Sequence, residues 1–176
     1  MKNNKGKWHE IVKYRPENYK DRIYTVEEWT SPSDIGNCVS GYILTLEEYL
    51  RVENNYLNTL KDILINSRCS YLYIPYAEIH ARWVKERLKH SKFKEPLTEI
   101  LPFILSVEEE TRVSVEKAVE LFRYCLRGYI YIELTNNSRG IAAYCGDDFY
   151  MSVKTPLSNK ILENIVSKHG LYLDPR

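Results

Sequence analysis

The stretch YIYIELTNNSRGIAAYCGDDFYMSVK, residues 129–154, decides the fold class. Its first part alternates aliphatic residues with tyrosine and glutamate, which is the period of a half-buried strand. Residues 136–140 (NNSRG) and Gly146-Asp147 supply the residue types that tight turns favour. The stretch therefore predicts a three-stranded antiparallel meander, with strands near residues 129–135, 141–145 and 149–154.

Four helices are predicted around the meander. The clearest begins after Thr45, where Thr45 and Glu48 match a capping box and apolar residues recur at intervals of three and four through about residue 66. The other three cover residues 76–90, residues 115–127 behind a Ser114 cap, and residues 156–168 behind a Thr155 cap. Further strands are predicted at residues 23–26, 39–44 and 71–74, and Pro102 leaves residues 97–105 unassigned.

Length and pattern together predict one α+β domain that spans residues 1–176. We expect several helices packed on a mixed or antiparallel sheet, with the C-terminal meander followed by the last helix. Residues 1–7 contain three lysines, and we expect them to form a flexible basic N-terminus.

The composition argues against several classes of protein. Lys and Arg number 25 against 24 Asp and Glu, so the net charge of +1 does not indicate a nucleic-acid or membrane partner. No apolar run has the length of a membrane span, and the first residues do not form a secretory signal. The four cysteines contain no C-x-x-C spacing. We therefore expect a cytoplasmic protein with reduced thiols, no cofactor and no metal.

No common enzyme signature occurs in the chain, and the two nearest candidates have simple structural explanations. Gly146-Asp147-Asp148 matches the metal-binding tip of RNA polymerases over only three residues, and these residue types are also those of an ordinary turn. His80 is the histidine best placed to act as a general base, but it is also expected to flank the apolar face of its helix. We therefore predict no catalytic residue.

Tyrosine and acidic residues favour a contact surface instead. The fifteen tyrosines have two explanations, namely packing at the edge of the core and an interface. Residues 27–53 hold six acids against one arginine, a balance of −5. Glu53 interrupts the apolar stripe of its helix, so its carboxylate must be paired within the fold or exposed to a partner. The predicted contact residues are Glu28, Trp29, Asp34, Tyr42, Glu47, Glu48 and Glu53, with the basic residues Arg82, Lys85 and Lys89 as the next candidates.

Two segments, YTVEEWTSPSDIG (residues 24–36) and GYILTLEEYLRVE (residues 41–53), resemble cytoplasmic immunity proteins of bacterial contact-dependent growth inhibition and related polymorphic toxin systems. The resemblance implies a protein that binds one toxin domain, often a nuclease such as a tRNase, and blocks its active site. These proteins share no functional motif, so no residue role is carried over. Immunity proteins that face basic nucleases are commonly acidic, and this chain departs from that pattern.

The expected function is therefore an immunity protein that neutralises a cognate toxin domain, without enzymatic activity and without direct nucleic-acid or membrane binding. One alternative is a small nuclease-like enzyme that uses His80 and neighbouring basic residues. Another is an adaptor protein of a phage or mobile element.

Overall fold

The structure is a computed structural model, and it describes residues 6–176. These residues form a seven-stranded sheet, antiparallel throughout, in the order β11-β1-β10-β9-β8-β6-β7. Its strands are β1 (Lys7–Val12), β6 (Tyr71–Glu78), β7 (Thr111–Ser114), β8 (Tyr131–Asn136), β9 (Ile141–Cys145), β10 (Met151–Thr155) and β11 (Tyr172–Leu173). Two small hairpins stand apart from it, β2 (Tyr19–Lys20) with β3 (Ile23–Tyr24) and β4 (Cys38–Val39) with β5 (Tyr42–Ile43).

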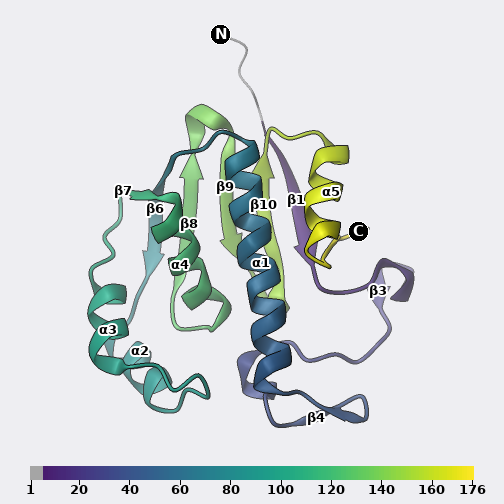
Figure 1. The fold of residues 1–176 in the computed structure, drawn as a ribbon, viewed down its shortest axis with the longest axis horizontal. Coiled ribbons are helices and arrows are strands. Elements are labelled where there is room, and N and C mark those ends of the chain that lie inside the picture. The colour runs from purple at the N-terminus through teal and green to yellow at the C-terminus, as the bar shows by residue number, and fades with distance from the viewer. Residues whose placement is uncertain (1–5) are drawn as a thin grey trace.

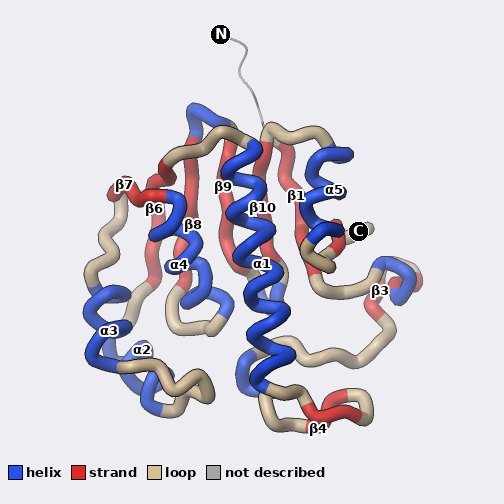
Figure 2. Tube along the Cα trace, viewed as in Figure 1, coloured by secondary structure: helices blue, strands red, loops and turns tan. Residues whose placement is uncertain are grey.

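The helices cover one face of the sheet (Figures 1 and 2). They are α1 (Leu46–Asn66), α2 (Ala81–Lys89), α3 (Leu97–Leu105), α4 (Val115–Leu126) and α5 (Asn159–Lys168). The helices α1, α4 and α5 lie side by side over the strands, whereas α2 and α3 pack on each other beyond one end of the sheet. The α+β class and the single domain predicted from the sequence are confirmed. None of the helices in residues 6–176 combines the length and the apolar composition that a bilayer crossing requires.

The longest helix, α1, forms where its cap and its apolar stripe predict it. The Thr45 hydroxyl accepts a hydrogen bond from the Glu48 amide at 3.1 Å, which satisfies one of the free N–H groups of the first turn. The Glu48 carboxylate does not complete the capping box, because it pairs with Arg51 instead. Tyr49 and Tyr56, on the inner side of the helix, are fully buried.

The meander β8-β9-β10, followed by α5, confirms the prediction for the C-terminal third. The Asn136 side chain accepts the Arg139 amide at the first turn, and Gly140 adopts a φ of 68°, which glycine tolerates without strain. Along β8 the buried and half-buried residues alternate strictly, as the sequence indicates.

Other boundaries predicted from the sequence are wrong. The helix expected from residue 76 begins only at Ala81, because β6 continues to Glu78 by pairing with β8. The last helix begins at Asn159, and Thr155 is the end of β10. Residues 39–44 form two strands of a hairpin, and residues 97–105 form a helix around Pro102.

The N-terminal prediction is also corrected in part. Lys7 is not part of a flexible terminus, because it begins β1 and pairs with Thr155. Residues 1–5 lie outside the described part of the chain, so the structure does not test the prediction for them. β1 occupies an inner position in the sheet, between β10 and β11.

Candidate functional site

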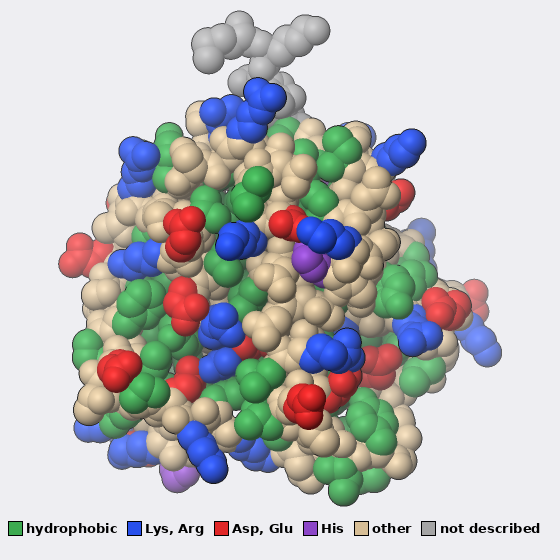
Figure 3. All heavy atoms as spheres, viewed as in Figure 1, with side chains coloured by type: hydrophobic (Ala, Val, Ile, Leu, Met, Phe, Trp, Pro, Cys, Tyr) green, Lys and Arg blue, Asp and Glu red, His purple; other side chains and the backbone are tan. Residues whose placement is uncertain are grey.

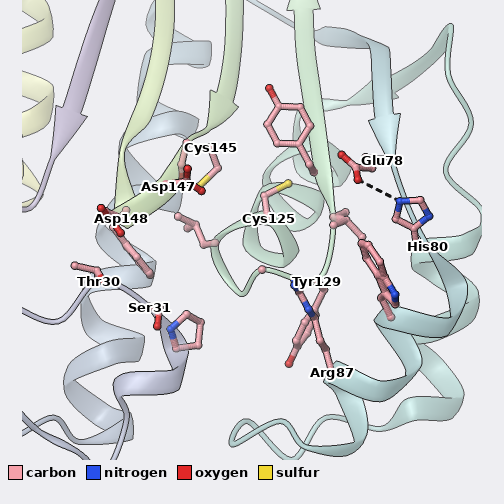
Figure 4. Close-up of a pocket in the computed structure, with 18 residues that line it drawn as sticks. Thr30, Ser31, Glu78, His80, Arg87, Cys125, Tyr129, Cys145, Asp147 and Asp148 are labelled. Atoms are coloured by element: carbon pink, nitrogen blue, oxygen red, sulfur yellow. Dashed lines mark hydrogen bonds and ion pairs between the residues drawn. The ribbon is translucent and has the colours of Figure 1, made fainter.

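A cleft of about 320 Å³ opens at the end of the sheet where α2 meets strands β6, β8 and β9. One wall comes from β6 and α2, and the other from the turn between β9 and β10 together with the loop at residues 30–32 (Figure 4). The residues between the walls are mostly uncharged: Cys125, Leu126, Gly128, Tyr129, Ile130 and Cys145. The cleft brings together His80 and the Gly146-Asp147-Asp148 turn, which lie more than sixty residues apart in the sequence.

The α2 wall carries a hydrogen-bonded His80–Glu78 pair, an exposed tryptophan and a separate arginine. His80 Nε2 lies 3.1 Å from the Glu78 carboxylate, and both side chains are about half exposed. The Trp83 ring contacts the His80 ring edge to face, with 4.6 Å between centroids. The Arg87 guanidinium lies over Gly128, so that a Cβ added to that glycine would be 3.4 Å from Arg87 Nη1.

The opposite wall is a backbone turn held in an unusual conformation. Asp148 and Phe149 have φ values of 54° and 60°, a left-handed conformation that bulky residues rarely adopt. The Tyr14 hydroxyl donates to the Asp148 carbonyl and the Tyr56 hydroxyl to the Phe149 carbonyl, each at 2.6 Å. Burial raises the pKa of both hydroxyls, so they remain protonated donors. The fold therefore fixes the position of Asp147 and Asp148.

A row of aromatic rings crosses the sheet face that the helices leave uncovered. It consists of Trp8 on β1, Tyr144 on β9, Tyr131 on β8 and Tyr76 on β6, and we call these four residues the aromatic row. Successive ring centroids are 5.6, 6.4 and 6.0 Å apart. Trp8 and Tyr76 are 51% and 45% exposed, although large apolar groups are usually covered.

Strand register explains why these rings share one face. Glu133 pairs with Tyr144 on one side and with Tyr76 on the other, so the three side chains project in the same direction. The neighbouring residues on this face are also partly exposed, including Tyr73 at 41%. The row is continuous with the cleft, because Tyr131 belongs to both.

Hydrogen bonds occupy some of the polar groups beside the row. The Tyr131 hydroxyl donates to Glu133 at 3.3 Å, and Ser152 donates to Glu10. At the edge of the sheet, the Arg112 guanidinium lies 3.7 Å from the centroid of Tyr71. The face therefore combines aromatic rings with carboxylates and with the cations Arg112 and Lys154.

Among the residues predicted to contact a partner, Glu53 and Trp29 are buried, so these two predictions are corrected. Glu53 is fully buried and accepts hydrogen bonds from Arg123 at 2.9 Å and from Arg127 at 2.7 Å. Its partners are Arg123 on α4 and Arg127, the residue that directly follows this helix. Trp29 is 3% exposed and packs against Tyr49 and Phe149. Neither side chain is available to a partner in this structure.

Glu28 also makes contacts within the fold. Its carboxylate lies 2.7 Å from Nζ of the buried Lys13 and accepts a hydrogen bond from the Tyr24 hydroxyl. Lys13 in turn lies over the ring of Trp29, 4.4 Å from its centroid. Burial lowers the pKa of Lys13, and the Glu28 carboxylate opposes that effect.

The other predicted contact residues are at least partly exposed. Asp34 accepts the backbone N–H groups of Thr30 and Ser31 and so closes a local capping box. Tyr42 is 44% exposed, and Glu47 is exposed in the first turn of α1. Tyr42 and Glu48 line a second groove of about 490 Å³ together with Glu28.

The acidic balance of residues 27–53 does not persist as an acidic surface. The second groove contains three acids, Glu27, Glu28 and Glu48, and three bases, Lys13, Arg15 and Arg51. On the helix-covered face as well, basic and acidic side chains are interspersed (Figure 3). The folded chain therefore mixes charges that are segregated in the sequence.

Within residues 6–176, no three His, Cys, Asp or Glu side chains gather as a potential metal-binding group. Asp147 and Asp148 therefore have no third such ligand among the described residues. No family model, curated protein or solved structure matches this chain. The residues of the cleft and of the aromatic row are therefore the basis for a proposed function.

The aromatic row was only partly visible in the sequence. The tyrosine content favours an interface and the alternation of Tyr131 with Ile132 predicts a half-buried strand, but neither pattern shows which face of the sheet is uncovered. Trp8 was missed, because the sequence around it does not have the pattern of a strand. Tyrosine on the outward positions of several neighbouring strands was the one available signal.

Cysteine reactivity provides a first test of the packing around the cleft. Cys38 is exposed, whereas burial raises the pKa of the Cys125 thiol to about 12 and that of Cys145 well above its ordinary value. Burial also raises the pKa of Cys69. We expect one thiol to react rapidly with an aromatic disulfide reagent in native buffer, because only the thiolate attacks. Cys38→Ser should remove that fast phase. Rapidly reacting thiols that remain in the variant would show that the other cysteines are not buried as the structure places them.

Proposed function

We propose that this protein binds a protein partner through the uncovered face of its sheet, and that the partner is a toxin domain that it neutralises. The observation that carries the proposal is the aromatic row. Tyr and Trp are enriched at interfaces because they bury much area while ordering few rotatable bonds. From β1 to β6 the row crosses four strand spacings, roughly 19 Å. The row therefore spans much of the width of a surface patch that buries about 800 Å² on each side of an interface.

The charges beside the row favour a protein over a nucleic acid. Proteins that stack bases on aromatic rings surround the rings with cations that contact phosphates. Here Glu10, Glu78 and Glu133 lie on the same face as the rings, together with the cations Lys154 and Arg112. Beside Trp8 and Glu10, Arg176 lines a groove as well, but its guanidinium is paired with Asp174. The carboxylates would repel a phosphate backbone but would attract basic groups of a protein.

The resemblance of residues 24–36 and 41–53 to immunity proteins supports a toxin domain as the partner. A direct experiment is to express each neighbouring gene product alone, to identify any that is toxic, and then to co-express the toxic domain with this protein. We expect growth to be restored and a stable complex to be recovered. Toxicity that continues in the presence of soluble, folded protein would reject the proposal.

A second candidate is the nuclease-like enzyme, and the specific observation in its favour is the cleft. It places His80, paired with Glu78, across from Asp147 and Asp148. Under the proposal made here, however, the purified protein should leave tRNA, DNA and simple esters intact, with or without divalent cations. Incubation of labelled tRNA with wild type and with His80→Ala measures this. Cleavage by wild type that the variant lacks would favour the enzyme.

A further inference from the structure

We infer that the cleft receives a segment of the partner that carries a basic side chain for Asp147 and Asp148 and an acidic side chain for Arg87. This inference rests on the proposed function and specifies the chemistry of the partner at one part of the surface. It concerns the cleft, whereas the proposed function is carried by the aromatic row.

The acidic side of the cleft has no ion-pair partner among residues 6–176, although the Asp148 charge acts at longer range on Lys13, where it opposes the lowering of the ammonium pKa by burial. The Asp147 and Asp148 side chains are exposed, and neither makes an ion pair or a side-chain hydrogen bond with another residue of the described chain. The Tyr14 and Tyr56 hydroxyls fix the backbone of this turn through hydrogen bonds to the Asp148 and Phe149 carbonyls. Because the two carboxylates are already positioned, a cation that binds them pays little entropy for ordering the turn.

The basic side of the cleft is also unmatched. Arg87 is exposed and forms no ion pair within residues 6–176, while its guanidinium rests over the turn at Gly128. His80 and Glu78 differ in this respect, because they pair with each other. Apart from this hydrogen-bonded pair, the cleft presents two carboxylates on one wall and one guanidinium on the other (Figure 4).

The size and position of the cleft suit a segment of a partner. A volume of about 320 Å³ holds a few side chains, and the lining between the walls is largely uncharged. Tyr131 lies both in the cleft and in the aromatic row, so one partner can contact both. The row supplies apolar area, and the two charged walls fix the orientation of the partner. A partner with charges of one sign would satisfy only one wall.

The test measures association and dissociation of the toxin domain identified by the co-expression experiment with three forms of the protein. These are the wild type, Asp147→Asn/Asp148→Asn, and Arg87→Gln, each at low and at physiological ionic strength. Both variants should raise Kd by on the order of tenfold at low salt, and the difference should shrink as salt screens the charges. Glu163→Gln and Lys160→Gln, exposed on α5, are the matched controls and should change Kd less than about twofold.

The aspartate variant removes negative charge and Arg87→Gln removes positive charge, so their effects on Kd distinguish a partner segment with both charges from one with a single charge. If Arg87→Gln strengthens binding while the aspartate variant weakens it, the partner segment is purely basic and the inference is wrong. Unchanged Kd values in both variants would also overturn it, and the proposed function would stand if Tyr131→Ala/Tyr144→Ala still lost binding. Absence of wild-type binding would reject the function and the inference together. Urea unfolding of every variant confirms that the comparisons are made between folded proteins.

Discussion

Replacing Glu53 by alanine is expected to lower the free energy of unfolding by about 3 kcal/mol or more. Glu53 is fully buried, and its two oxygens accept hydrogen bonds from Arg123 and Arg127. The Arg127 side chain is only 7% exposed, so the substitution leaves a guanidinium largely removed from water without its main partner. Glu95 retains one contact to Arg127, at 2.6 Å, which limits the loss.

The matched control is Glu48→Ala on the same helix, which removes a pair with Arg51 that is largely exposed. It should cost less than about 1 kcal/mol. Urea denaturation gives both values. A double-mutant cycle with Arg127→Ala should be strongly non-additive, because both substitutions remove the same contact. A loss below about 1 kcal/mol for Glu53→Ala would show that the ion-pair network does not hold α1 to α4.

The double substitution Tyr131→Ala/Tyr144→Ala is expected to abolish most of the affinity for the toxin domain. Central aromatic contacts at interfaces contribute about 2 kcal/mol or more each, so even one such contact changes Kd roughly 30-fold. Stability should fall much less, because both rings are only half-buried and side-chain contacts between neighbouring strands contribute about 0.2–1 kcal/mol. Isothermal calorimetry and urea unfolding separate the two effects.

Ile161→Ala is the control for this substitution, because Ile161 is 43% exposed on α5, on the helix-covered side of the sheet. It should leave the affinity unchanged. Equal losses in the tyrosine variant and the control, or no loss in either, would place the partner away from the aromatic row.

The sequence predicts those parts of the fold that depend on neighbours in the chain. The α1 stripe, the Ser114 cap of α4 and the turns of the meander all act within a few residues, and each lies where it was expected. The single α+β domain follows from them. The end of β6 was missed because Tyr76 to Glu78 are held as a strand by pairing with β8, more than fifty residues away.

The candidate site depends even more on distant residues. Glu53 was recognised as unusual from its place in the stripe, but its partners Arg123 and Arg127 lie seventy residues or more further along the chain. In the second groove, Lys13 and Arg15 from outside the acidic segment join its own Arg51 and balance Glu27, Glu28 and Glu48. The aromatic row joins residues from three separate regions of the sequence, and Trp8 meets Tyr144 across β10 only because the sheet places β10 between β1 and β9.

Hydroxyl-radical footprinting of the complex with the toxin domain tests the use of the uncovered sheet face most directly. Oxidation of each aromatic side chain is compared by mass spectrometry in the free protein and in the complex. We predict protection of Trp8, Tyr76, Tyr131 and Tyr144, with Tyr42 oxidised equally in both states. Protection confined to Tyr42 and the second groove, with the four residues of the aromatic row still fully reactive, would contradict the account.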